Sequence, residues 1–207
     1  MATCYSKGRR VWTHGGGRAI LEAMRVVSKK AKTSAIYQLK ITLEGVRPPI
    51  WRRVLAPGGI RLDALHTVIQ IAMGWTDSHP HKFVKGGNQW ALPHGGEDIY
   101  SEKLDEREFQ LHELLTRAGE SLLYVYDFGD DWRHKVVLEK ILTDSEGPRR
   151  PTCVGGKRTG PPEDSGGIYG FVEMAADEGY DDEGYEFSVA GVDAALERED
   201  WRTDSMG

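Results

Sequence analysis

The sequence predicts an α+β fold: a single domain in which one principal helix packs on a mainly antiparallel sheet, with short helices toward the C-terminus. Short runs of alternating apolar and polar residues, bounded by Gly, Pro and Asp, indicate half-buried strands. One longer stretch, residues 62–73, has apolar residues at helical spacing instead. With 207 residues, the chain has room for one ordinary core. We place this domain at 35–200, between an extension, 1–34, and a tail, 201–207.

The first elements are two strands and the principal helix. Strands are expected at 36–43 and 50–55, because apolar residues alternate in the first and a Pro-Gly-Gly turn at 57–59 ends the second. The helix that follows ends at Gly74, a residue suited to the left-handed position after a helix. Its apolar stripe comprises Leu62, Leu65, Val68, Ile69, Ala72 and Met73.

The remaining elements are shorter and are separated by turn signals. Further strands are predicted at 81–85, 89–92, 122–128 and 132–142, where Gly-Gly-Asn and Gly-Asp-Asp sequences form the hairpin turns. Short helices are predicted at 109–117, 170–176 and 192–198. Two stretches, 93–108 and 144–167, are expected to be irregular, since the first is polar and the second is rich in Gly and Pro.

Charge is unevenly distributed along the chain. Residues 1–34 hold eight Lys or Arg and one acid, so the rest of the chain carries a net charge of −12. Phosphate is repelled by such a domain, and nucleic acid is expected to bind only through 1–34, where residues 18–30 have the spacing of a short amphipathic helix. A loosely ordered appendage is the other interpretation of 1–34. Self-association with the acidic stretch 144–207 is a third.

Several classes of protein are excluded or disfavoured. No apolar run approaches the roughly 18 residues of a membrane span, and no secretory signal is visible, so we expect a cytoplasmic protein. Two cysteines, Cys4 and Cys153, do not make a disulfide scaffold. Phosphate-binding glycine loops, the HExxH zinc motif and the GxSxG nucleophile turn are all missing from the sequence.

The hairpin at 124–134 is the densest group of polar residues. It brings together Asp127, Asp130, Trp132 and His134. Aspartates at turns usually accept hydrogen bonds from backbone N–H groups, and that is the favoured role for Asp127 and Asp130. A small acidic pocket that binds a ligand is the functional alternative.

A second polar group is Asp77, His79 and His81. If they lie on one strand, the two histidines point the same way and can ligate one divalent metal ion, zinc or manganese. Asp127 or His134 would be the further ligand of this metal ion. His66 lies on the predicted helix that precedes these residues. Hydrogen-bonding or surface roles for each histidine remain the favoured alternative, because a pair of ligands does not make a metal site.

The loop at 160–167 is the third candidate. It contains Glu163 and Asp164 between a Pro-Pro and a Gly-Gly pair, just before a predicted short helix. Capping of that helix is the simpler role of the acids, and a clamp on a ligand is the alternative.

A series of short motifs occurs in order along the chain. They are Ile36-Tyr37-Gln38-Leu39-Lys40; Pro49-Ile50-Trp51-Arg52-Arg53; Leu65-His66 with Ile69-Gln70 and Met73-Gly74-Trp75; Asp77-Ser78-His79 with His81 and Phe83; Tyr126-Asp127-Phe128-Gly129-Asp130 with Trp132 and His134; Pro151 with Cys153; and Pro161-Pro162-Glu163-Asp164 with Gly166-Gly167. Together, over about residues 35–200, they resemble the plasmid pRiA4b ORF-3-like family.

This resemblance implies a single α+β domain of a kind found on plasmids and in bacterial and archaeal genomes, sometimes among mobile-element proteins. It implies no established reaction or ligand. Members of the family often carry cysteines where this chain has Gly160 and Ser165, so a thiolate metal site is not expected here.

We therefore expect a non-catalytic binding or adaptor module that meets an unidentified protein partner. In that case Trp51, Trp75 and Trp132 fill the core. The alternative is a metal-dependent hydrolase or nuclease whose metal-bound water is the nucleophile. Its residues would be His79, His81, Asp127, Asp130 and His134.

Overall fold

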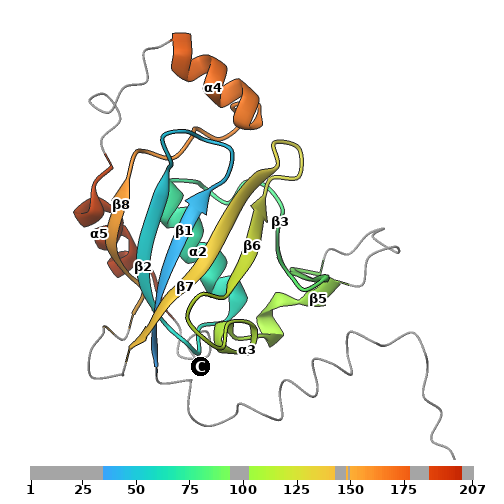
Figure 1. Cartoon of the computed structure of the whole chain (residues 1–207), viewed down its shortest axis with the longest axis vertical. Helices are drawn as coiled ribbons and strands as arrows, with labels where there is room; N and C mark the ends of the chain where they lie inside the picture. Colours follow the sequence, from blue (N-terminus) through green and yellow to red (C-terminus); the bar gives the residue numbers. More distant parts are fainter. Residues whose placement is uncertain (1–34, 94–102, 143–147, 149, 178–186, 202–207) are drawn as a thin grey trace, which may run out of the picture.

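The computed structural model describes residues 35–93, 103–142, 148, 150–177 and 187–201. They form an eight-stranded mixed sheet in the order β5-β4-β3-β6-β7-β1-β2-β8 (Figure 1). Neighbouring strands of this sheet are antiparallel except β4 and β5, which run parallel. The strands are β1 (Ile36–Leu43), β2 (Trp51–Pro57), β3 (His81–Lys85), β4 (Asn88–Ala91), β5 (Lys103–Asp105), β6 (Ser121–Tyr126), β7 (Trp132–Leu142) and β8 (Thr152–Lys157).

The helices differ in how closely they join the sheet. The principal helix α2 crosses one face of the sheet, and α5 contacts both β8 and α2 (Figure 1). The helix α4 projects beyond the ends of the strands. The helices are α2 (Leu62–Met73), the 3₁₀ turn η1 (Glu106–Glu108), α3 (Leu111–Leu114), α4 (Gly167–Asp177) and α5 (Val189–Arg198). The α+β class is therefore confirmed.

The core joins α2 to the central strands, as the apolar patterns predict. The alternating residues of β1 are at most 1% exposed, and all six residues of the α2 stripe are buried in the same core. Gly74 ends α2 with a φ of 85° and donates its N–H to Gln70. Of the three tryptophans expected in the core, Trp75 and Trp132 are buried. Trp51 lies half-exposed, with Lys40 and Arg53 over its ring.

Two stretches expected to be irregular contain regular structure. Residues 103–105 form β5 because they pair with β4, and residues 106–108 form η1. No local sequence pattern predicts the pairing of β5 with β4. Residues 152–157 form β8 against β2. A side chain at Gly156 of that strand would meet the ring of Phe187 at 2.2 Å, so the missing side chain is what allows the contact.

The extension 1–34, with its expected helix at 18–30, lies outside the described residues, as do residues 202–207 of the tail. Among the residues that the structure describes, no helix has the length and apolar character needed to cross a membrane.

Candidate functional site

Four polar side chains form what we call the buried cluster: His66, His81 and Glu106, which are buried, and Asp77, whose side chain is 60% exposed. They come from α2, the loop after α2, β3 and η1. His66 Nε2 lies 2.8 Å from Asp77 Oδ1. His81 Nε2 lies 3.0 Å from each carboxylate oxygen of Glu106. The two imidazole rings stack, with centroids 3.5 Å apart and planes 4° from parallel. Ligand atoms of His66, Asp77 and His81 all lie within 4.8 Å of one another.

A ring of hydrogen bonds orients His66 within this cluster. The backbone N–H of Asp77 donates to Gln70 Oε1 at 2.9 Å, which turns the amide nitrogen of Gln70 toward Tyr124. That nitrogen donates to the Tyr124 hydroxyl at 2.9 Å, and the hydroxyl lies 2.8 Å from His66 Nδ1. Because both His66 nitrogens have a partner, the ring plane is held and Nε2 faces Asp77.

Burial and pairing set the charges of the cluster. Burial lowers the pKa of His66, although its hydrogen bond to Asp77 partly offsets this effect. The hydrogen bond with His66 holds the pKa of Asp77 below its usual value. Burial raises the pKa of Tyr124 well above its ordinary value. The carboxylate of Glu106 is completely buried and is partnered by His81, so this charge depends on a compensating positive group.

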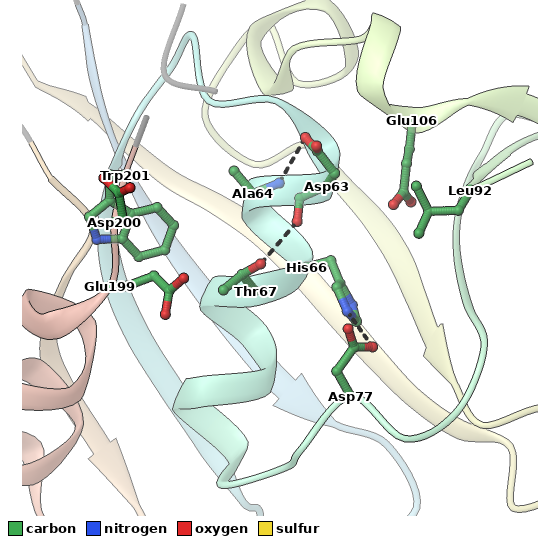
Figure 2. A pocket seen from close by; sticks show the side chains of 10 residues that line it. All are labelled: Asp63, Ala64, His66, Thr67, Asp77, Leu92, Glu106, Glu199, Asp200 and Trp201. Carbon is green, nitrogen blue, oxygen red and sulfur yellow. Dashed lines mark hydrogen bonds and ion pairs between the residues drawn. The ribbon is translucent and has the colours of Figure 1, made fainter. Parts of the chain in front are cut away.

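A cavity of about 250 Å³ opens beside the buried cluster (Figure 2). His66, Asp77 and Glu106 line one side, and the residues just after α5 line the other. The wall includes five carboxylates, which favour cations and repel phosphate. These are Asp63, Asp77, Glu106, Glu199 and Asp200, accompanied by Leu92 and Trp201.

A second group, which we call the loop cluster, consists of His79, Asp127 and Asp164. His79 Nε2 lies 3.0 Å from Asp164 Oδ1 and 3.8 Å from Asp127 Oδ2. The three residues come from the loop before β3, the β6–β7 turn and the loop after β8. Asp164 is exposed, whereas Asp127 is buried and His79 is half-buried. The cluster is therefore open to solvent on the Asp164 side.

Other hydrogen bonds tie these three loops together. Glu163 accepts from the backbone N–H of Thr76 at 3.1 Å and from the Tyr126 hydroxyl. Burial alone would raise the pKa of Glu163, but the bonds from Thr76 and Tyr126 hold it below its usual value. Asp130 Oδ2 accepts from the N–H of Gly166 at 3.1 Å, which joins the β6–β7 turn to the residues before α4.

The structure separates the two histidines that were expected to share one metal ion. His79 precedes β3 and belongs to the loop cluster, whereas His81 begins β3 and belongs to the buried cluster. Pro80 stands between them, so the strand alternation that would align them does not reach His79. Each histidine instead meets its own carboxylates.

The other predicted residues take different places. Asp127 has its expected turn role, since Oδ1 accepts from the N–H of Gly129 at 2.9 Å. Asp130 bonds across to the next loop instead. Trp132 and His134 lie in the core and belong to neither cluster, and the His134 ring is edge-on to Trp75. His134 therefore does not complete the predicted metal site.

Glu106 is the functional candidate that sequence reasoning missed. It lies in the stretch 93–108, which the sequence presents as a polar loop, and it is 0% exposed in the fold. For His66 the sequence predicts only a position on the helix before the Asp77–His81 segment. No local pattern marks either residue, because their proximity to His81 depends on the packing of α2, β3 and η1.

The plasmid pRiA4b ORF-3-like protein family matches residues 35–190, so the chain belongs to this family. An uncharacterised protein of Sinorhizobium fredii (strain NBRC 101917 / NGR234), y4hQ, is 38% identical over 144 residues, which cover 68% of this chain and 72% of that protein.

The fold is also similar to a solved structure. The crystal structure of MM3350, a protein of unknown function from Methanosarcina mazei Go1, matches with a TM-score of 0.65 and 35% identity. The match covers 76% of this chain and 96% of that one. The family and the α+β fold are thus established together.

Proposed function

We propose that the protein is a binding module whose ligand is a divalent metal ion held by the buried cluster. The observation that carries this proposal is the convergence of His66, Asp77 and His81, whose ligand atoms lie within 4.8 Å of one another. Two imidazole nitrogens with carboxylate oxygens are donor types that suit zinc, and one of the two stacked rings must turn for both nitrogens to face the same ion. Glu106, in contact with His81, is placed to act as a fourth ligand or to orient that histidine.

The burial of Glu106 supports this proposal independently. A fully buried carboxylate is costly unless a positive charge accompanies it, and its partner here, His81, is charged only when protonated. A divalent cation supplies the missing charge without requiring a proton. The hydrogen bonds from Gln70 and Tyr124 would support the bound state by holding His66 in place.

The cavity supports binding over the nuclease alternative. Its five carboxylates, among which Asp63 is paired with Arg61, would repel a phosphodiester substrate and attract a hydrated cation toward the cluster. The residues assigned to the hydrolase hypothesis are also dispersed: His79 and Asp127 lie in the loop cluster, His81 in the buried cluster, and His134 in the core.

Metal analysis of the purified, untagged protein tests the proposal. We expect one tightly held equivalent of zinc in the wild type, and its loss in His81→Gln and in Glu106→Gln. The matched control is His79→Gln, the same substitution two positions away in the other cluster, which should keep the zinc. Circular dichroism confirms that each variant is folded.

Two results would contradict the proposal. One is a wild type that takes up no zinc even when zinc is supplied in excess after refolding. The other is a folded His81→Gln variant that retains zinc as well as His79→Gln does.

A further inference from the structure

His79 has an unusual environment within the loop cluster. Its Nε2 atom has almost no solvent-accessible surface and makes no hydrogen bond of acceptable geometry. Carboxylate oxygens of Asp164 and Asp127 nevertheless lie 3.0 Å and 3.8 Å away. Buried polar atoms normally have a hydrogen-bond partner, so the lack of one at His79 Nε2 requires a physical reason. The nitrogen faces both oxygens, and its contact with Asp164 is an ion pair only when the imidazole carries a charge.

We infer that the loop cluster is a second divalent-cation site, separate from the buried cluster. His79 Nε2, Asp127 Oδ2 and one Asp164 oxygen are its three protein ligands, all within 4.8 Å of one another. A cation between them satisfies the unpaired nitrogen and the facing carboxylates together. No residue is shared with the buried cluster, so this inference does not depend on the proposed function.

The surrounding loops hold the ligands in position. Asp127 uses Oδ1 for the turn, accepting from the N–H of Gly129, which leaves Oδ2 facing His79. Tyr126 and Glu163 join the strand that precedes Asp127 to the loop that carries Asp164. The three ligands come from three loops that hydrogen bonds already hold together. Binding of a cation therefore costs little conformational entropy of the chain.

The donor set indicates the kind of ion. One imidazole and two carboxylates form a harder donor set than the buried cluster, which has two imidazoles, and the Asp164 side chain is 75% exposed. Carboxylate and water ligands suit manganese, whereas imidazole-rich sets suit zinc. We therefore assign manganese to the loop cluster, with water at the positions that the protein leaves open on the Asp164 side.

Titration of the full chain with Mn²⁺, followed by electron paramagnetic resonance, tests the inference. Bound Mn²⁺ loses the sharp signal of the free ion. We expect saturable binding to the wild type, weakened about tenfold or more in His79→Gln and in Asp164→Asn. Glu106→Gln, which alters only the buried cluster, should bind Mn²⁺ at this site like the wild type.

Asp131→Asn is the matched control for charge. It removes one exposed carboxylate from the same hairpin, outside the cluster. Equal weakening by Asp131→Asn and Asp164→Asn would mean general attraction to acidic surface and would overturn the inference, as would a wild type that shows no saturable binding. Zinc retention in the same variants is measured separately, so failure of the buried cluster does not affect this outcome.

Discussion

At the scale of single residues, burial decides the charge of His134. Its side chain is 0% exposed, Nδ1 donates to the Trp132 carbonyl at 3.1 Å, and Trp75 packs edge-on against the ring. Burial lowers its pKa to about 3, with a small further contribution from Arg52. This histidine is therefore neutral in the folded protein at all ordinary pH values.

His134 should make the protein less stable in acid. The unfolded chain binds a proton below a pKa of about 6.5 and the folded chain does not, so stability falls as the pH drops from about 6.5 toward 3. We expect the wild type to lose about 2 kcal/mol more than His134→Phe between pH 7 and pH 5. Urea unfolding of both proteins at the two pH values measures this difference, and equal losses would contradict it.

At the scale of elements, the β6–β7 turn and the start of α4 fit tightly together. Gly167, the first residue of α4, has a φ of 66°, and a side chain there would approach the Asp130 carbonyl oxygen to 2.5 Å. Both the backbone angle and the contact therefore require glycine. The same contact helps to place Asp127 and Asp164 beside His79.

Gly167→Ala should thus be destabilising. Strain at positive φ and overpacking against the turn together predict a loss of about 2–3 kcal/mol in the free energy of unfolding. Gly155→Ala is the control, because a side chain at Gly155 in β8 meets its neighbours at 3.7 Å, an ordinary contact. Chemical denaturation measures the free energy of unfolding of both variants. Similar losses in the two would contradict the prediction, because they would show that the contact between residue 167 and the Asp130 carbonyl relaxes without cost.

At the scale of the whole molecule, charge asymmetry suggests self-association. Residues 1–34 are strongly basic and the remainder carries a net charge of −12. If the extension of one copy binds the acidic region of another, wild-type protein will be oligomeric at low salt. Deletion of 1–34, or about 1 M salt, where the Debye length is about 3 Å, should leave monomers. Light scattering measures the oligomeric state, and a state that is unchanged after deletion would contradict the hypothesis.

The sequence by itself determined the elements whose signals are local. The alternating apolar residues of β1 and the apolar stripe of α2 each indicate which face of the element is buried. Both segments were therefore predicted with nearly the observed bounds. Asp127 was likewise assigned its turn role, because that hydrogen bond spans two residues. Five members of the two clusters were also among the predicted candidates: Asp77, His79, His81, Asp127 and Asp164.

Only the tertiary structure decided how these candidates group. His81 stacks on His66 and meets Glu106, while His79 meets Asp127 and Asp164, and each contact joins segments that are distant in the sequence. The sequence did not predict β5 and β8 for the same reason. Pairing with β4 and β2 stabilises these strands, and their own sequences lack a local strand pattern. Such contacts depend on packing across the whole sheet, and no local sequence pattern marks the polar residues and short strands that this packing brings together.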